Sequence, residues 1–214
     1  MDVDEIRARL DELHDRPADT LAVDSIAVAL RTSAVLLLLW EEFGEVWLAL
    51  TRRGPTLRAH PNEVSLPGGT GEPGESPSDT ALREAVEETG IDPRQVTIVG
   101  RLDDAWSAAG HHIVPVVAWH YGVPPFRADG IEVVEVIQLV LAELGDPTNH
   151  SEKIVALGDI NYVDDVLRCS GITIVGVTAD IIIDLVHWLE GLDRRRVPAR
   201  MQGLEYLART GRLP

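Results

Sequence analysis

The chain has 214 residues, which is the size of one ordinary domain, and its 45% apolar and 25% charged residues are normal for a globular protein. This composition excludes collagen, coiled-coil and disordered proteins. With 35 acidic against 19 basic residues, the net charge of −16 excludes nucleic-acid binding by bulk electrostatic attraction. It leaves open a local site at which carboxylates hold divalent cations.

The chain carries no sign of export or membrane insertion. Its N-terminus has neither the basic nor the apolar region of a signal peptide. The longest purely apolar run is 34–40, far below the ~20 residues of a membrane span. The single cysteine, Cys169, excludes an intrachain disulfide and is interpreted as an inert thiol. We therefore expect a cytoplasmic protein whose partners include neither nucleic acid nor a membrane.

Apolar periodicity and turn residues predict alternating strands and helices. The predicted elements are, in chain order, a helix at 3–14, strands at 31–40 and 45–52, a Gly- and Pro-rich loop at 54–76, a helix from there to Gly90, strands at 95–102, 112–119, 131–141 and 172–177, and helices at 178–192 and about 198–210. Ser76 is the expected N-cap of the second helix, Pro77 its first residue and Gly90 its stop. Pro115 predicts that the strand at 112–119 is an edge strand or is bulged.

The order of these elements predicts a mixed α/β domain with helical additions at both ends. We expect an N-terminal helical extension at 1–30 and a core at 31–165. The remainder, 166–214, is expected to form a C-terminal strand and helices that pack on the core.

The second helix gathers like charges on one face. At ~100° per residue, Glu84, Glu87 and Glu88 share a face with Arg83, while apolar residues form the opposite face. Pairs of like charges at this spacing destabilise a helix by a few tenths of a kcal/mol even when exposed. Arg83 offsets one of the three negative charges. A hard cation such as Mg²⁺ or Mn²⁺ would offset the rest. Such a site can bind a diphosphate and activate water; the alternative is a solvated charged helix face.

The spacing around this helix identifies a family. From Gly69 through Glu75 to Ile91 the chain reads G-x5-E-x7-R-E-A-V-E-E-T-G-I. This resembles, without a gap, the signature of the Nudix hydrolases, and only Ala85 is smaller than the bulky apolar residue expected there. The resemblance implies the Nudix fold, a mixed β-sheet sandwiched between α-helices. It also implies a diphosphate hydrolase that needs Mg²⁺ or Mn²⁺ and acts on a nucleotide.

The same resemblance implies roles for individual residues. The implied metal ligands are Glu84, Glu87, Glu88 and the backbone carbonyl of Gly68. Glu84 is the candidate that activates the water, and Arg83 would orient a carboxylate. Structural roles are implied for Gly69, Glu75 and Gly90.

Two other enzyme classes have weaker support. Residues 69–74 also read G-x-G-x-x-G, but Glu72 and Glu75 would repel a pyrophosphate and Pro73 interrupts the loop, so a dinucleotide-binding loop is rejected. A Ser-His-Asp hydrolase built on His111 or His112 lacks a nucleophile elbow.

The segment upstream of the Nudix signature indicates which class of substrate the chain cleaves. Residues 50–69 resemble the coenzyme A pyrophosphatase motif L-L-T-x-R-(S/A)-x3-R-x3-G-x3-F-P-G-G. The matching residues are Thr51, Arg53, Arg58, Pro67, Gly68 and Gly69, and the departures are Gly54, Asn62 and Leu66. The likeness extends over about 35–190. It implies cleavage of coenzyme A, or a derivative, to 3′,5′-ADP and 4′-phosphopantetheine.

Basic residues are concentrated just before the Nudix signature in an otherwise acidic chain. The candidates for substrate binding are Arg52, Arg53, Arg58 and His60. Guanidinium groups suit bidentate contacts with phosphate. The alternative is that these side chains balance nearby acids, and Arg52 has the further alternative of pointing to the other face of its strand.

The sequence leaves the assisting carboxylate and the substrate open. Glu132 is the first candidate for an assisting acid and Glu135 the second, while Asp103 and Asp104 are weaker. The alternative functions are hydrolysis of another nucleoside diphosphate derivative, such as ADP-ribose, a dinucleotide or a nucleoside triphosphate, and a non-catalytic Nudix module that senses a nucleotide. The family often forms homodimers, but no stretch of this sequence identifies an interface.

Overall fold

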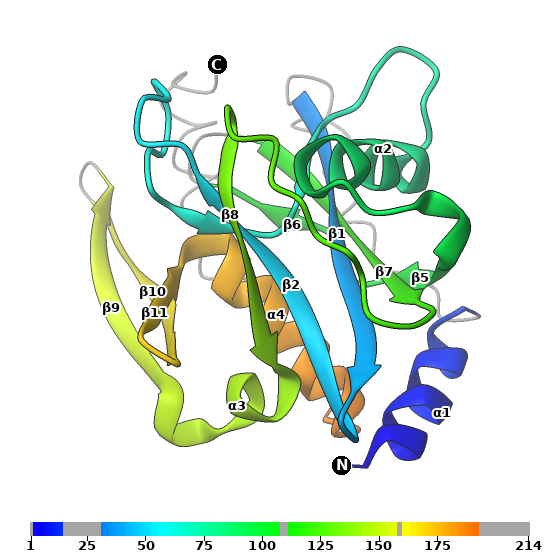
Figure 1. Cartoon of the computed structure of the whole chain (residues 1–214). Coiled ribbons are helices and arrows are strands. Elements are labelled where there is room, and N and C mark those ends of the chain that lie inside the picture. The colour runs from blue at the N-terminus through cyan, green and yellow to red at the C-terminus, as the bar shows by residue number, and fades with distance from the viewer. Residues whose placement is uncertain (1, 15–30, 108–110, 158–159, 193–214) are drawn as a thin grey trace.

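The computed structural model describes residues 2–14, 31–107, 111–157 and 160–192 (Figure 1). The helices are α1 (Val3–Leu13), α2 (Pro77–Thr89), α3 (Leu141–Gly145) and α4 (Gly176–Leu189), with 3₁₀ turns at Pro93–Gln95 and Pro147–Asn149. The strands are β1 (Arg31–Glu42), β2 (Glu45–Arg53), β3 (Val64–Ser65), β4 (Gly68–Thr70), β5 (Val96–Arg101), β6 (Ala105–Trp106), β7 (His111–His120), β8 (Val133–Val140), β9 (His150–Leu157), β10 (Ile160–Cys169) and β11 (Ile172–Val175). Most elements predicted from sequence are confirmed. The helix predicted at 198–210 lies outside the described residues.

Among the described helices, none has the length and apolar character needed to cross a bilayer.

Strand β1 is the centre of the main sheet. It runs parallel to β7 along one edge and pairs antiparallel with β2 along the other, but only near their shared turn, where Leu39 lies opposite Leu48. Beyond that point β1 and β2 diverge, and β3 and β4 fill the gap, β3 pairing with β2 and β4 with β1. The Leu36 N–H donates to the Pro67 carbonyl at 2.8 Å. The divergence therefore seats the loop that precedes α2 inside the sheet.

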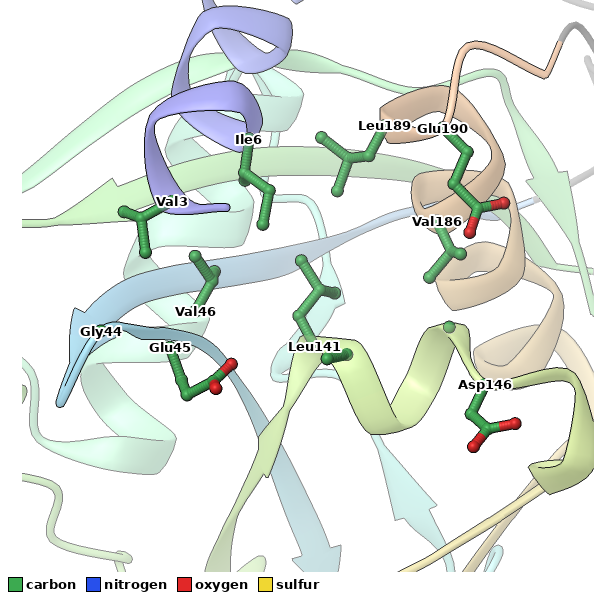
Figure 2. A pocket seen from close by; sticks show the side chains of 12 residues that line it. Val3, Ile6, Gly44, Glu45, Val46, Leu141, Asp146, Val186, Leu189 and Glu190 are labelled. Atoms are coloured by element: carbon green, nitrogen blue, oxygen red, sulfur yellow. The ribbon is translucent and has the colours of Figure 1, made fainter. Parts of the chain in front are cut away.

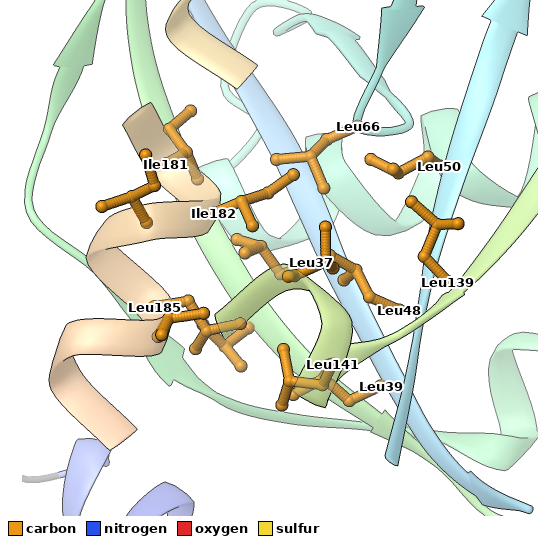
Figure 3. Packing of buried hydrophobic residues seen from close by; sticks show 14 of the residues in the cluster. Leu37, Leu39, Leu48, Leu50, Leu66, Leu139, Leu141, Ile181, Ile182 and Leu185 are labelled. Atoms are coloured by element: carbon orange, nitrogen blue, oxygen red, sulfur yellow. The ribbon is translucent and has the colours of Figure 1, made fainter. Parts of the chain in front are cut away.

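Both faces of β1 are buried, as expected for a strand covered by helices on both sides. Leu36, Leu38 and Trp40 pack in one cluster with Ala81 and Ala85 of α2. Leu37 and Leu39 pack on the other face with α4, and Figure 3 shows Ile182 of α4 pointing toward Leu37. This arrangement confirms the predicted mixed sheet between helices.

Of the two alternatives predicted from Pro115, the edge strand is wrong, whereas a bulge is present in the pairing of β7 with β5, between Ile98 and Gly100. Strand β7 lies between β1 and β5 in the interior of the sheet. The Pro115 carbonyl accepts from Leu102 N at 3.0 Å, on the side where pairing passes from β5 to β6. Since the N and C=O of one strand residue point the same way, the missing N–H of Pro115 faces this break in pairing. An interior proline is tolerated there because no regular partner requires its hydrogen.

A second, three-stranded antiparallel sheet has the order β11-β10-β9 (Figure 1). Sequence reasoning predicted only β11. Charged residues interrupt the apolar pattern by which β9 and β10 could have been predicted. Lys153 and Asp164 lie opposite each other in the middle of these strands, with Lys153 Nζ 3.3 Å from Asp164 Oδ2. The boundary expected between 165 and 166 lies within β10, and the division into 1–30, 31–165 and 166–214 stays a prediction.

The two-sided burial of β1 gives a stability prediction. Leu37→Ala should lower the free energy of unfolding by about 2–5 kcal/mol because the side chain is fully buried between the sheet and α4. Ile154→Ala on β9 is the control: its side chain is 76% exposed, so a change within about 0.5 kcal/mol is expected. Urea unfolding followed by circular dichroism measures both, and equal losses would contradict the packing described.

Candidate active site

Helix α2 has the ends that the sequence predicts. The Ser76 hydroxyl accepts from the Asp79 N–H at 3.2 Å as the N-cap. Gly90 closes the helix in the left-handed region, at φ 69°, and its N–H donates to the Val86 carbonyl at 2.9 Å. Because α2 buries Ala81 and Ala85 against β1, its acidic face is turned toward the neighbouring loops.

The backbone of β4 lies directly against two carboxylates of α2. A Cβ added at Gly69 would lie 2.5 Å from both Cδ and Oε1 of Glu84. No side chain fits there, so glycine allows the carboxylate to rest on the strand. One residue earlier, the Gly68 N–H donates to Glu88 Oε2 at 3.1 Å. The two glycines thus bring Glu84 and Glu88 against the same short strand.

Arg83 joins the acids on the outer side of α2. Its guanidinium forms a bidentate pair with Glu75, at 2.9 Å from Nε and 3.1 Å from Nη2. Its Nη1 also donates to Glu84 Oε1 at 2.9 Å and to Glu87 Oε2 at 3.5 Å. Glu75 accepts two further bonds, from the Thr80 hydroxyl at 2.8 Å and the Glu72 N–H at 3.0 Å. The result is a network in which Arg83 fixes Glu75 and draws Glu84 and Glu87 toward itself.

The network has the expected electrostatic effect on Glu75. The hydrogen bonds from Arg83, with that from the Glu72 N–H next in importance, lower the pKa of Glu75 to about 2. Glu75 is therefore an anion at neutral pH, and the pKa of Arg83 is raised in return, mainly by its hydrogen bonds to Glu75.

Glu88 is in the opposite situation. Its side chain is buried, at 6% exposure, and burial raises its pKa to about 8. Smaller contributions to this value come from the Gly68 N–H and the charge of Arg53, which lower the pKa, and from the negative charges of Glu84 and Glu132, which raise it. Glu132, from the loop before β8, thus acts on the same buried carboxylate as the helix. Of the later acids considered from sequence, it is the one whose charge acts on Glu88.

Arg52 and Arg53 point to different surroundings, with a register shift between them in the pairing of β2 with β8. The Arg52 guanidinium pairs with Glu135 across the strands, Nε to Oε2 at 2.7 Å. Glu135, the second choice for an assisting acid, is therefore already matched by a cation. Arg53 faces the site, where its charge acts on Glu88, and its buried Nε has no hydrogen-bond partner in the described structure.

The remaining candidates do not join this group of contacts. His60 is exposed and pairs with Glu63. Arg58 is exposed on the loop before β3. Asp104 is buried and forms an ion pair with Arg101, and its Oδ2 lies 2.9 Å from His112 Nε2. Arg101 therefore compensates the charge of Asp104 outside the site on α2. The neighbouring Asp103 is half-buried.

The donor set suits a hard divalent cation. Glu84, Glu87 and Glu88 offer carboxylate oxygens, which Mg²⁺ and Mn²⁺ prefer. The charges of Glu84 and Glu132 act unfavourably on ionised Glu88, and a cation would relieve this repulsion. In the described part of the chain, however, no three acidic, histidine or cysteine side chains converge closely enough to hold one ion. Glu84 and Glu87 are both turned toward Arg83. Binding an ion would require them to turn from it.

A separate cavity of about 180 Å³ lies at the other end of β1 (Figure 2). It lies between the start of α1, the β1–β2 turn, α3 and the end of α4, and it is lined by side chains such as Ile6, Leu141 and Val186. None of the α2 carboxylates lines it, so it is not part of the site described above.

Sequence reasoning missed Asp129 and did not give Gly54 a structural role. Asp129 accepts three backbone N–H groups of the loop that carries Glu132. The sequence feature that could have revealed Asp129 is the Asp129-Gly130 dipeptide, which is typical of turns and lies just before Glu132. Gly54 contacts the same loop through its backbone.

Comparison with known proteins agrees with this geometry. The model of the family described as NUDIX domain matches residues 30–154. A protein of Yersinia pestis (strain Pestoides F), described as an uncharacterized Nudix hydrolase NudL, is 38% identical over 100 residues, which cover 46% of this chain and 50% of the relative. The chain thus matches about half the length of that curated relative.

Several solved structures are similar to this chain at low sequence identity. A MutT/nudix family protein from Enterococcus faecalis is 16% identical, with a TM-score of 0.49, and the match covers 95% of this chain and 74% of that one. The NUDIX domain of Shewanella oneidensis NrtR, solved in complex with ADP ribose, is 19% identical with a TM-score of 0.43, covering 54% and 75%. These likenesses are too low to add weight to the family match.

The loop–helix geometry at Gly68–Thr89 and the match of the family model over more than half of the chain lead to one conclusion: this chain belongs to the NUDIX family and has the Nudix fold.

Proposed function

We propose that this chain is a metal-dependent hydrolase of a nucleoside diphosphate derivative. The observation that carries the proposal is the buried carboxylate of Glu88, which is held on the Gly68 N–H while Glu84 and Glu132 add negative charge around it. A fold gains nothing in stability from such a group, since burying a charge without a counter-ion is costly. Perturbed carboxylates of this kind cluster at functional sites.

Glu84, Glu87, Glu88 and the Gly68 carbonyl would hold Mg²⁺ or Mn²⁺. When bound, the cation supplies charge neutralisation for the diphosphate and a water of lowered pKa. The chain's own carboxylates then take up the proton of the water that attacks phosphorus, Glu84 being the first candidate and Glu132 an assisting one. Attack forms one P–O bond and breaks the bridging P–O bond, so the leaving phosphate carries away the bridging oxygen.

Arg83 and Glu75 would support this chemistry without touching the substrate. The bidentate pair fixes the guanidinium, which in turn holds Glu84 at 2.9 Å. Because the pKa of Glu75 is held at about 2, the pair stays charged across the neutral range. Arg83 can therefore compensate Glu84 and Glu87 before a cation arrives.

For the substrate, we propose coenzyme A or one of its derivatives, cleaved to 3′,5′-ADP and 4′-phosphopantetheine. Two of the three departures from the motif are structurally conservative. Asn62 adopts φ 61°, a left-handed conformation that glycine favours and asparagine tolerates. Leu66 is buried in the main apolar cluster, where one large apolar residue can replace another.

The third departure, Gly54, has a steric reason. A Cβ at this position would lie 2.7 Å from the Ile131 carbonyl oxygen, so the serine or alanine of the motif would collide with the loop before β8. The departures thus reflect local packing, and they are compatible with the specificity that the motif implies.

A mixture of candidate substrates tests the proposal directly. Purified protein with Mg²⁺ or Mn²⁺ is incubated with equimolar coenzyme A, acetyl-coenzyme A, ADP-ribose, NADH and diadenosine polyphosphates, and mass spectrometry follows which parent disappears. We expect loss of the coenzyme A species and appearance of 3′,5′-ADP. Glu88→Gln should slow turnover at least about 100-fold, whereas Glu12→Gln on α1 should not change it.

Other outcomes separate the alternatives. Loss of a different substrate would contradict the coenzyme A assignment but keep the hydrolase. Binding without any turnover would favour a nucleotide-sensing module. Near-normal turnover by Glu88→Gln would contradict the role given to the buried carboxylate.

The positions of the two arginines predict different specificity effects. Arg53 lies beside the acidic site, so Arg53→Gln should lower kcat/KM about equally for coenzyme A and for dephospho-coenzyme A, which lacks the 3′-phosphate. Arg58 is exposed away from these contacts, and we propose that it binds the 3′-phosphate of coenzyme A. Arg58→Gln should therefore lower kcat/KM about tenfold for coenzyme A alone, the loss expected for one charge-assisted hydrogen bond. Steady-state kinetics on both substrates distinguishes the two roles; equal losses from Arg58→Gln would contradict its contact with the 3′-phosphate.

The pKa of Glu88 predicts how stability depends on pH. Its folded-state pKa of about 8 lies above the unfolded value of 4.5, so the folded state binds the proton more tightly. The contribution of Glu88 to stability therefore falls as the pH rises from 4.5 to 8 and stays unfavourable above that range. Glu88→Gln removes this penalty and should raise Tm above pH 8 by at least about 2–4 °C, with little effect near pH 4.

Thermal unfolding across this pH range, without and with Mg²⁺, checks the prediction. Mg²⁺ should stabilise the unmodified protein more than the variant, because a cation that binds only the folded state raises its stability. A variant less stable than the unmodified protein at pH 9, in the absence of metal, would contradict the unfavourable burial of Glu88.

A further inference from the structure

The loop that carries Glu132 is built around one carboxylate. Asp129 Oδ1 accepts the N–H groups of Ile131 at 2.6 Å, Glu132 at 2.9 Å and Val133 at 3.0 Å. The Gly130 N–H closes the turn by donating to the Val133 carbonyl at 2.8 Å. A single acceptor oxygen thus fixes the backbone on both sides of Glu132, which is itself exposed.

The carbonyl side of Glu132 is held by a different element. The Gly54 N–H, just after β2, donates to the Glu132 carbonyl at 2.8 Å. A Cβ at Gly54 would lie 2.7 Å from the Ile131 carbonyl oxygen and 3.6 Å from that of Glu132. The loop can approach β2 this closely only because residue 54 has no side chain.

The same loop is tied to the end of α2. The Arg127 N–H donates to the Thr89 carbonyl at 2.7 Å and the Asp129 N–H to the Glu88 carbonyl at 3.3 Å. These are carbonyls of the last turn, which has no partner within the helix. The residue that carries the buried carboxylate therefore also anchors, through its backbone, the loop that presents Glu132.

Building on the proposed function, we propose that Asp129 is a positioning residue, which together with Gly54 holds Glu132 opposite the carboxylates of α2. Asp129 does not touch the substrate in this proposal. Its carboxylate acts through the backbone of residues 131–133, and Gly54 sets how deeply that backbone sits against β2. A displacement of about 1 Å at such an acid can reduce turnover by about 100-fold.

The decisive experiment is a double-mutant cycle between Asp129 and Glu132. Asp129→Ala should lower kcat about 10- to 100-fold with little change in KM. If Asp129 acts through Glu132, Asp129→Ala should lower kcat less than about twofold further in the Glu132→Gln background, because the acid it positions is already absent. Asp129→Asn keeps an acceptor oxygen and should retain most of the activity. Gly54→Ala, which acts on the loop from the other side, should also lower kcat.

Hydrogen exchange gives a readout that does not depend on activity. The amides of residues 131–133 should exchange faster in Asp129→Ala than in the unmodified protein, and close to normally in Asp129→Asn. The matched control is Asp146→Ala. Asp146 Oδ1 accepts the Thr148 N–H at 2.8 Å in a similar turn at the start of the second sheet, so its loss should leave kcat and the exchange of 131–133 unchanged.

The outcomes separate this inference from the proposed function. If Asp129→Ala lowers kcat by the same factor in both backgrounds, or leaves kcat unchanged while Glu132→Gln is impaired, the positioning role is overturned and the hydrolase proposal stands. If Glu132→Gln itself turns over normally, the assisting role of Glu132 is overturned, and the inference with it.

Discussion

The close contact between the β4 backbone and the carboxylates of α2 is the constraint on which the site depends. Glu84 rests on Gly69 at a distance that no Cβ would permit, and Glu88 takes the Gly68 N–H. Neither contact would exist if β1 and β2 stayed paired along their length, since the 64–70 segment occupies the space between them. The irregularity of the sheet is thus what allows strand backbone and helix side chains to meet.

That contact gathers negative charge around Glu88, whose own carboxylate is buried. The acids of the site differ in how their charge is compensated. Glu75 pairs with Arg83 and remains ionised, whereas buried Glu88 accepts one N–H and has the charge of Arg53 nearby. The folded state therefore holds the proton of Glu88 more tightly than the unfolded chain does. A site that lowers stability in this way is typical of function, because selection for packing alone would not retain it.

The contacts also connect the two ends of the site mechanically. Helix α2 offers its side-chain carboxylates to β4 and its last carbonyls to the loop at 127–129. That loop continues through the turn at Asp129 to Glu132, whose backbone is held against Gly54 at the end of β2. Backbone hydrogen bonds thus join residues that are far apart in sequence, from the end of α2 through the loop to the end of β2.

The sequence by itself determined the chemistry and the local elements. The spacing of Glu84, Glu87 and Glu88 follows from helical periodicity, and Ser76 and Gly90 mark the helix ends because capping is a local interaction. Only the tertiary structure decided which acids come together, that Arg52 is taken by Glu135 while Arg53 faces the site, and that Pro115 lies inside the sheet at a break in pairing. It also decided the hydrogen bonds of Asp129 to the loop at 131–133 and the pairing of the second sheet, in which Lys153 and Asp164 interrupt the apolar pattern of the strands. Those features depend on non-local pairing between distant segments, and local periodicity carries no information about it.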